Sequence, residues 1–528
     1  MTRAVPILCL LLLSLPAQAA TEADTAAIES LASLGEDARP IGLKQSIEDA
    51  LAGNLGLRAR VLELEASERR MKASWAPFLP MLTAGGNFRP QRSENLLNEF
   101  DQQFWQRSTT NSGGYNVGLR TFLPTGTDLS FTFSQGAYDT STVYDPQPTI
   151  DSGIPGVAPI VVRDNFDYST RYASIRMNLN QSLLEGIAPA YQLRGVRKAR
   201  VALDAVDAQR EQDVITVTAN VLKAYWDLVA LRRNVEIKRI SVRLAEEQRD
   251  VTRARISAGD QAPIEVFRID ETVATRNAEL LEALRTAEEM EQSFKLYLGI
   301  SPADGDFSAP LRPLDGIDQV LPARSREASQ EVALERNPGL VMQRRGMASQ
   351  RIDQESAQHE LLPDLSVNAA LTLSGNGFDM EEAFEDIRET KFPDFELGVT
   401  FLMPLPDLGA IRSLEAAKLD VQRSQLNAES TELDVLGGVE SAFRSIRSFD
   451  EQLRVAEVRS KLAAKNTEAA EATYQAGRGT LRDVLEAQQA LEEARQAAIS
   501  AQVAAYKARV DLELLRGTLL EALGVEYD

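Results

Sequence analysis

Residues 474–487 read YQAGRGTLRDVLEA, a turn between two helical stretches, and this segment decides the fold. Gly477 follows the first stretch, and glycine often ends a helix because it tolerates the left-handed backbone conformation. Thr480, with Asp483 three positions later, is typical of a capping box that begins the next helix. The segment therefore predicts the tip of a helical hairpin. A purely structural turn would account for the glycines equally well.

A second turn of the same kind occurs earlier, where residues 256–266 read ISAGDQAPIEV. Gly259 takes the place of Gly477, and Pro263 is expected at the first position of the following helix. The two tips belong to an ungapped correspondence at an offset of 218 residues, which also relates Arg194 to Arg412, Val221 to Val439 and Gly299 to Gly517. A register kept without insertions suits long helices better than globular domains.

A further correspondence lies upstream of each hairpin. NLGL at 54–57 and NPGL at 337–340 are each followed by a proline 26 residues after the Asn, at Pro80 and Pro363. This offset of 283 exceeds the offset of 218 by 65 residues, so the first half carries that much extra sequence between Pro80 and Arg194. The two correspondences predict an internal duplication with an insertion in its first copy.

The helical stretches have a heptad pattern. In the first copy the expected core positions are Val214, Val217, Val221, Ala224, Leu228, Leu231, Val235, Val242 and Ala245, and Lys238 is the one polar break. The second copy continues the pattern with Val435, Val439, Ala442, Ile446, Phe449, Leu453 and Ala456. A filamentous two-stranded coiled coil is one interpretation. The many alanines, and the strands described next, favour a wider packed tube.

Strand-like alternation is confined to two places. In the first half it covers 115–122 and 128–134, on either side of a Pro-Thr-Gly-Thr turn, and 172–180; in the second half it covers 365–369 and 395–401. One face of these strands is apolar and aromatic, and the other is polar. A soluble sandwich would bury the apolar face, whereas an outer-membrane barrel would turn it toward lipid. Aromatic residues concentrate between Phe88 and Tyr172, which favours an interfacial girdle.

Composition excludes several classes of function. The 528 residues include 57 basic and 78 acidic side chains, for a net charge of −21, which disfavours nucleic-acid binding. A single His and a single Cys exclude a Cys/His metal cluster, and no nucleophile elbow or phosphate loop occurs, so we expect no enzyme, no cofactor and no metal site. Lone His359 is expected to be structural or exposed rather than catalytic.

The N-terminus has the features of a signal peptide. Arg3, an apolar run from Val5 to Leu15 and a small-residue Ala17-Gln18-Ala19 site predict cleavage after residue 19. Cys9 lies inside the apolar run, so lipidation is not expected. No later segment has 18 uninterrupted apolar residues, so a membrane span would have to use strands.

The expected organisation is an α+β membrane protein in two repeats. The first repeat, 20–300, would hold helices at 43–77, 188–257 and 263–298, with strands between about 82 and 183. A linker at 301–325 leads to the second repeat, 326–528, with helices at 326–361, 410–475 and 480–523 and strands at about 365–373 and 395–403.

With these features and the YQAGRGTLRDVLEA motif, residues 40–524 resemble the TolC-like outer-membrane efflux protein family. The resemblance implies a homotrimer in the outer membrane, with one shared β-barrel and an α-helical tunnel that extends into the periplasm. It implies a passive exit duct for efflux or type I secretion. Its partners would be outer-membrane lipid, a periplasmic adaptor, and an inner-membrane pump or ABC transporter. A periplasmic coiled-coil scaffold with a non-membrane β head is the alternative.

The resemblance also assigns roles to residues at the two tips. Asp483 and Glu486 match two acidic rings at the periplasmic entrance, with Glu486 in place of the usual Asp. A helix N-terminal charge preference is the alternative explanation of this pair. Tyr474 matches a gate-linking aromatic, and Arg478 stands one position before the usual gate Arg. The expected adaptor contacts are Ala258, Gly259, Asp260, Glu265, Ala476 and Gly477. The 115–134 hairpin would add to the barrel wall, giving six strands per chain, or form an extracellular hairpin beside four strands.

Overall fold

The computed structural model describes residues 38–525 except positions 100, 152, 260, 317–320, 322 and 323. The expected signal peptide with Cys9, and the expected tip residue Asp260, lie outside the described residues. The chain divides into two compact units. A helical unit contains the chain up to Leu64 with Val206–Gln343 and the segment from Ala428 onward, and a sheet unit contains Glu65–Ala205 and Arg344–Asn427.

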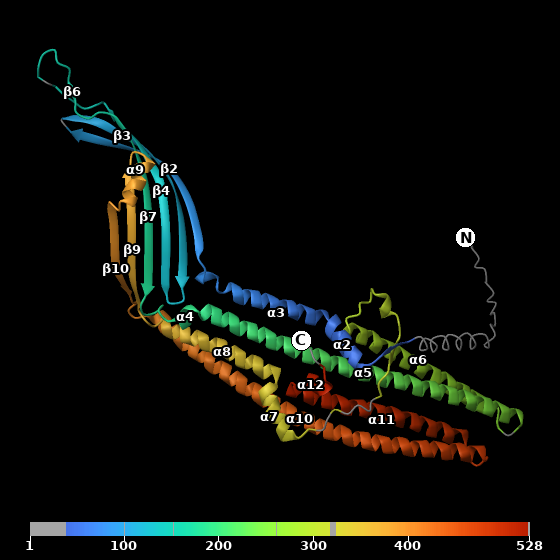
Figure 1. Cartoon of the computed structure of the whole chain (residues 1–528). Helices are drawn as coiled ribbons and strands as arrows, with labels where there is room; N and C mark the ends of the chain where they lie inside the picture. Colours follow the sequence, from blue (N-terminus) through green and yellow to red (C-terminus); the bar gives the residue numbers. More distant parts are fainter. Residues whose placement is uncertain are drawn as a thin grey trace, which may run out of the picture. The chain divides into compact units, whose positions relative to one another are not determined.

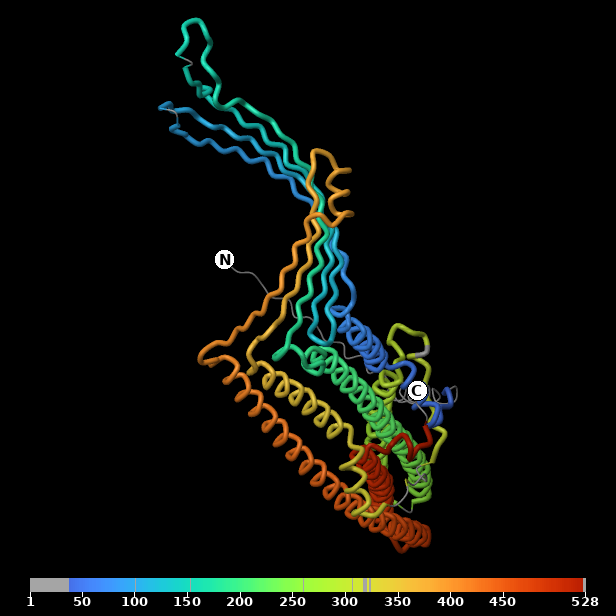
Figure 2. The backbone as a smooth tube through the Cα atoms, turned by 60° about the vertical axis from the view of Figure 1, so that its left-hand side comes forward, coloured from blue at the N-terminus to red at the C-terminus, as the bar shows by residue number. Residues whose placement is uncertain are grey.

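The sheet unit is built on one six-stranded antiparallel sheet, whose strands lie side by side in Figures 1 and 2. The strand order is β10-β9-β7-β4-β3-β2. The strands are β2 (Met81–Glu99), β3 (Gln102–Leu123), β4 (Thr127–Asp145), β7 (Phe166–Ser182), β9 (Asp364–Gly377) and β10 (Phe392–Leu402). A short pair, β5 (Thr149–Ile150) with β6 (Ile160–Val161), lies in the connection between β4 and β7.

The register aligns apolar residues into rows across the sheet. Direct pairing joins Leu82, Leu119, Phe131, Met177, Leu371 and Phe395 from one edge to the other. The neighbouring row, on the opposite face, is Thr83, Gly118, Thr132, Arg176, Thr372 and Asp394. Strand side chains alternate between faces, so the sheet has one apolar and one polar face. Most of the apolar row is exposed, with Leu82 at 73% and Phe395 at 68%.

The 115–134 hairpin lies inside the sheet. β3 and β4 pair with each other and are flanked by β2 and β7, so the sheet of one chain has six strands. The turn between them places Gly126 at a φ of 75°, where an added Cβ would lie 2.2 Å from the carbonyl oxygen of Gly186. This turn therefore sits where β7 leads into the helices. Within the described residues, the hairpin therefore forms two of the six strands of this sheet.

Helices form the remainder of the sheet unit. η1 (Ala76–Phe78) precedes β2, α4 (Pro189–Gln192) follows β7, and α9 (Met380–Arg388) connects β9 to β10. Parts of four long helices also belong to this unit: α3 (Leu55–Ala73), α5 (Arg194–Ser257), α8 (Pro338–His359) and α10 (Leu408–Gln475). The expected helix at 43–77 is divided, because α2 (Leu43–Gly53) ends at Asn54 before α3 begins. The expected helix at 326–361 is likewise divided at Asn337 into α7 (Arg326–Arg336) and α8.

The helical unit contains two helical hairpins, α5 with α6 (Glu265–Tyr297) and α10 with α11 (Leu481–Arg516). α12 (Leu519–Leu523) follows α11. β1 (Arg39–Ile41) pairs in parallel with β8 (Leu311–Pro313), and η2 (Gly305–Phe307) precedes β8. The main core gathers Tyr225, Trp226, Phe294 and Tyr506 around the α5, α6 and α11 helices. Edge-to-face aromatic contacts fix this core, with the rings of Trp226 and Tyr506 5.1 Å apart.

The heptad pattern in α5 marks the buried face. Seven of the nine predicted positions are buried: Val214, Val221, Ala224, Leu228, Val235, Val242 and Ala245. Val217 and Leu231 are partly buried against the same cores. An 18-residue window of α5 is apolar enough to cross a bilayer, but 61% of it is buried, which is typical of a core helix.

Candidate functional site: the paired hairpin tips

Both predicted tips are sharp turns in the helical unit. Gly259 and Gly477 have φ angles of 79° and 73°, the left-handed conformation that favours glycine. The predicted capping box is confirmed at the second tip, where Thr480 Oγ1 accepts from Asp483 N at 3.3 Å and Thr480 N donates to Asp483 Oδ2 at 3.0 Å. In the first tip α6 begins at Glu265, so Pro263 lies in the turn rather than at the first helical position.

Tyr474 joins the two tips. Its side chain is buried at 4% exposure, packed with Ile269 of α6 and with Leu481 and Val484 of α11. Gln261 Nε2 donates to the Tyr474 hydroxyl at 2.9 Å, and the guanidinium of Arg255 lies over the ring, 4.4 Å from its centroid. The aromatic residue assigned to a gate link therefore does contact the other hairpin.

The arginine in this contact is not the one expected. Arg478 is exposed, and its backbone N–H donates to Thr473 O at 3.0 Å. Arg255 and Gln261, which sequence reasoning missed, supply the polar contacts to Tyr474 instead. They are 219 and 213 positions from Tyr474 in the chain, so no local pattern could reveal the contact.

The acidic pair follows the second tip, on the first turns of α11. The Asp483 carboxylate accepts from the Thr480 hydroxyl at 2.7 Å and from its amide, and these hydrogen bonds lower the pKa of Asp483. The Glu486 carboxylate pairs with Arg482 at 2.6 Å, with both side chains exposed. In the single chain, then, Asp483 serves as a helix cap. Its pKa is lowered there, whereas mutual repulsion in a ring of carboxylates would raise it.

The expected adaptor-contact residues lie at the surface of the tips. Ala258, Gly259, Ala476 and Gly477 are exposed, and Glu265 is half-buried and pairs with Arg268 at 3.1 Å. Two large apolar side chains that sequence reasoning did not single out lie beside the first tip. Ile264 is 62% exposed and Phe267 is 72% exposed. Apolar side chains this open next to a tip are typical of a contact surface.

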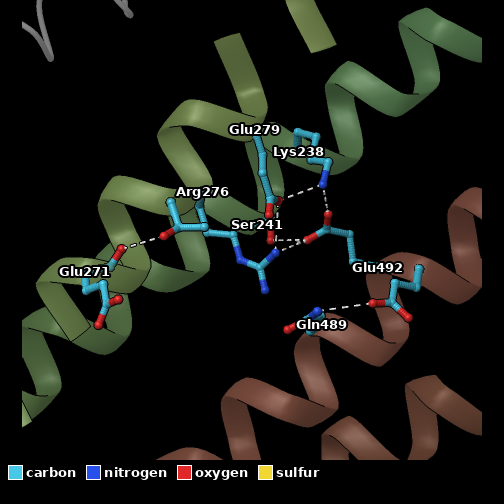
Figure 3. A network of polar contacts seen from close by, with 9 residues as sticks. Lys238, Ser241, Glu271, Arg276, Glu279, Gln489 and Glu492 are labelled. Atoms are coloured by element: carbon cyan, nitrogen blue, oxygen red, sulfur yellow. Dashed lines mark hydrogen bonds and ion pairs between the residues drawn. The ribbon is translucent and has the colours of Figure 1, made fainter. Parts of the chain in front are cut away.

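A second polar cluster lies further along the hairpins and connects α5, α6 and α11 (Figure 3). Lys238, the predicted polar break, donates to Glu279 Oε2 at 2.7 Å and pairs with Glu492. Arg276 contacts both carboxylates, at 3.0 Å and 3.2 Å, and Ser241 Oγ donates to Glu492 at 2.6 Å. Two cations and two anions balance, and the Glu492 side chain is only 7% exposed. The cluster therefore ties the first hairpin to a helix of the second.

Comparison with known proteins agrees with this architecture. Residues 330–518 match the family described as outer membrane efflux protein. The pyoverdine export outer membrane protein OpmQ of Pseudomonas aeruginosa is 24% identical over 352 residues, which cover 65% of this chain and 71% of that protein. The alkaline protease secretion protein AprF of the same organism is 22% identical over 329 residues, covering 62% and 66%.

Solved structures share the fold along nearly the whole chain. The outer-membrane channel OprN superposes with a TM-score of 0.63 at 18% identity, covering 90% of this chain and 89% of OprN. VceC of Vibrio cholerae superposes with a TM-score of 0.62 at 16% identity, covering 92% and 97%. The second part of the chain therefore matches the outer membrane efflux protein family, and the whole chain has the fold of outer-membrane channels. Members of this family are channels rather than enzymes.

Proposed function

We propose that three copies of this chain form one channel-tunnel, a passive exit duct through the outer membrane. The observation that carries the proposal is the six-stranded sheet with two unpaired edges. Among the described strands, β2 and β10 each pair on one side only. An open sheet edge in a bilayer would leave backbone groups without partners, so the edge of one copy must meet the edge of the next.

A heptad of exposed leucines on α10 supports association of copies. Leu419, Leu426 and Leu433 recur every seven residues and are 64%, 65% and 70% exposed. An apolar stripe of this spacing is typical of a helix that packs against a partner helix. A single chain leaves the stripe in solvent, and a ring of copies would cover it.

Six strands per chain give a barrel of 18 strands in a trimer. Barrels of about 16–18 strands leave an aqueous channel. The exposed apolar row from Leu82 to Phe395 would face lipid, and the row from Thr83 to Asp394 would face the lumen. The lumen face is rich in uncharged Ser, Thr and Asn, which suits a duct without strong selectivity in its barrel.

The paired tips would form the periplasmic entrance. Asp483 and Glu486 would line it, and Tyr474 with Arg255 and Gln261 would hold it closed. Exposed Gly259, Gly477 and the neighbouring Phe267 would receive the periplasmic adaptor, which brings cargo from an inner-membrane pump. The named relatives are a pyoverdine export protein and an alkaline protease secretion protein, so the cargo would be a small molecule or a secreted protein.

The mass of the purified protein in detergent tests the trimer. Light scattering corrected for detergent should give the mass of about three chains. Replacing Leu419, Leu426 and Leu433 together with serine should lower the fraction of trimer, because the apolar stripe is lost. A control that replaces exposed Lys44, Glu48 and Glu327 with serine should leave it unchanged. A wild-type mass of one chain would overturn the proposal.

Labelling tests the strand count. Single cysteines placed from Val117 to Phe133 should react with an impermeant biotin reagent only where they face the lumen, in an alternating pattern. Uniform labelling of this segment from outside intact cells would show that the hairpin is a surface loop.

Deletion of the gene for this protein would identify the cargo, because ducts for a small molecule and for a protease differ in which molecule accumulates inside the cell.

A further inference from the structure

α9 covers part of the apolar face of the sheet. It follows β9 at the end remote from α8, and it leads into β10. The ring of Phe384 stacks on that of Phe133, with centroids 6.1 Å apart and an interplanar angle of 8°. Phe133 lies two residues after Phe131 on β4, so the two side chains share the apolar face. The helix therefore lies on the side of the sheet that the proposed barrel turns toward lipid.

The sheet is shaped to receive this helix. An added Cβ at Gly375 would lie 1.9 Å from the carbonyl oxygen of Ala383, and one at Gly377 would lie 2.6 Å from Cβ of Glu382. Ala383 is fully buried at this contact, and we call Gly375 and Gly377 with the part of α9 above them the seat of the helix. Lys391 Nζ, at the start of the return to β10, donates to Asp386 Oδ1 at 2.8 Å. Two glycines at the end of β9 thus allow close contact between helix and sheet.

The sequence of α9 is locally suited to a helix. Asp379 is the N-cap and accepts from Glu382 N at 2.9 Å. Glu381 and Glu382 in the first turn and Arg388 in the last turn match the helix dipole. The short helix is therefore a formed element rather than a turn of the connecting loop.

Two phenylalanines of this segment remain open at the end of the apolar strip on β9. That strip runs through Leu365, Val367, Ala369, Leu371 and Leu373, and ends at Gly375 under α9. Phe378 is 81% exposed, and Phe384 is 42% exposed despite its stack on Phe133. The ring of Phe384, stacked on Phe133, continues the exposed apolar surface of the sheet, which is the lipid-facing surface in the proposed barrel.

We propose that α9 is an interfacial helix on the outside of the barrel, where Phe378 and Phe384 contact the acyl chains of outer-leaflet lipid. The inference rests on the proposed barrel. Residues 378–391 carry six acidic and two basic side chains, so the helix would have little affinity for a membrane by itself. The seat at Gly375 and Gly377 is what holds its aromatic residues at the lipid surface, with its acidic side turned to the headgroups and water.

Nitroxide labels on the full protein test this placement. The sequence has one cysteine, Cys9, so a Cys9→Ser background accepts single labels at Phe378→Cys and Phe384→Cys. In phosphatidylcholine vesicles, collision with dissolved oxygen reports lipid, and collision with a water-soluble nickel chelate reports water. Phe131→Cys and Ser134→Cys are the reference sites for the lipid and lumen faces of β4. The ratio of oxygen to nickel collisions at 378 should be several-fold higher than at 134.

A second experiment alters the glycine contact that allows α9 to lie close to β9. Gly375→Ala should displace the helix and move the label at 378 toward water, while Gly398→Ala, which meets no described atom within 4 Å, should not. A label at 378 that is in water while the label at 131 is in lipid would overturn the inference and leave the barrel intact. A label at 378 shielded from both reagents would mean that a neighbouring copy covers α9, which also overturns it. If the label at 131 were itself in water, the proposed barrel would fail.

Discussion

The guanidinium carbon of Arg255 lies 4.4 Å from the centroid of the Tyr474 ring, so a cation at the end of α5 rests on an aromatic ring at the end of α10. Gln261 adds a hydrogen bond to the hydroxyl of the same ring. A cation over an aromatic face contributes about 0.5–2 kcal/mol, depending on how far the pair is shielded from water. Two contacts on one buried ring thus link the two tips.

Removing the cation should loosen the proposed gate. Arg255→Met keeps most of the side-chain volume and loses the contact with the ring, so single-channel conductance in a planar bilayer should rise. Tyr474→Phe loses only the bond from Gln261 and should give a smaller rise. Arg253→Met is the matched control, because Arg253 is two residues away and pairs with Asp270 at 3.1 Å on the exposed surface. Equal conductance in wild type and Arg255→Met, or an equal rise in the control, would contradict the assignment.

Neutralising the acidic pair should remove cation preference. A ring of carboxylates should make the wild-type channel prefer cations and let multivalent cations block it from the periplasmic side. Asp483→Asn with Glu486→Gln keeps the size of both side chains and should remove both properties. Insertion and trimer should persist, since charges at a helix start contribute only ~0.3–1 kcal/mol each. Glu48→Gln on α2 is the control. A double variant that keeps the block would place these carboxylates away from the pore.

Acidification separates the two carboxylates. Hydrogen bonds from Thr480 lower the pKa of Asp483, so this carboxylate stays charged below the ordinary range of an aspartate. In a Glu486→Gln background, cation preference should therefore survive to a lower pH than in a Glu486→Gln, Thr480→Ala background. The capping contribution of Asp483 has the same sign: it is present above the unfolded pKa and is lost as pH falls through the folded pKa. Identical pH profiles for the two backgrounds would count against the role of Thr480.

Sequence patterns predicted the elements that depend on local periodicity. The alternation of 115–122 and 128–134 predicted a hairpin, and the heptad of α5 predicted its buried face. The strands run further than the alternation does. Around Thr109 and Thr140 the residues on both faces of the sheet are polar, and backbone pairing with neighbouring strands holds these segments in place. α9 was missed although Asp379 followed by an amphipathic segment was visible, because nine residues are short for a helix in isolation.

Lys238 shows that the heptad pattern does not predict the partners of a buried polar residue. In the heptad of α5 it looks like a defect, since a lysine there should be costly to bury. Its partners, Glu279 on α6 and Glu492 on α11, lie 41 and 254 positions away. Only the fold brings them together, and the same holds for Arg255 and Gln261 at Tyr474. Contacts between the two hairpins could therefore not be predicted from either hairpin.

Removing one charge from the cluster around Lys238 should destabilise the protein more than replacing an oppositely charged pair. Glu492→Ala leaves Lys238 and Arg276 with one carboxylate between them, and loss of one buried partner costs about 3–5 kcal/mol. Lys238→Met with Glu492→Leu leaves the pair of Arg276 and Glu279 intact and should cost much less. Thermal unfolding in detergent should therefore rank Glu492→Ala below the double variant. The reverse order would mean that the cluster is not a closed network.

The cluster should also weaken on acidification. Burial raises the pKa of Glu279, but hydrogen bonds from Lys238 and Arg276 outweigh burial and leave the pKa lowered. Its stabilising contribution is then present above the unfolded pKa and lost as pH falls through the folded pKa. The unfolding temperature of Glu279→Gln should approach that of wild type as pH falls through this range. A gap between the two that is constant with pH would contradict the linkage.

Two glycines with the same backbone angle should respond differently to substitution. Gly259 and Gly299 both have a φ of 79°. An added Cβ at Gly259 meets no described atom within 4 Å, whereas one at Gly299 would lie 2.3 Å from the carbonyl oxygen of Gly53, at the end of α2. Gly259→Ala should therefore cost only the left-handed conformation, about 1–2 kcal/mol. Gly299→Ala should cost that and the displacement of a backbone carbonyl.

Asparagine distinguishes the two contributions, because it tolerates the left-handed conformation better than alanine but occupies more space. Gly259→Asn should unfold at a temperature closer to wild type than Gly259→Ala does. Gly299→Asn should be no better than Gly299→Ala, since the obstacle there is the Gly53 carbonyl and not the backbone angle. Thermal unfolding of the four variants in detergent measures both comparisons. Recovery by asparagine at both positions would show that α2 can shift away from Gly299, and that the close approach seen between Gly53 and Gly299 does not constrain the helical unit.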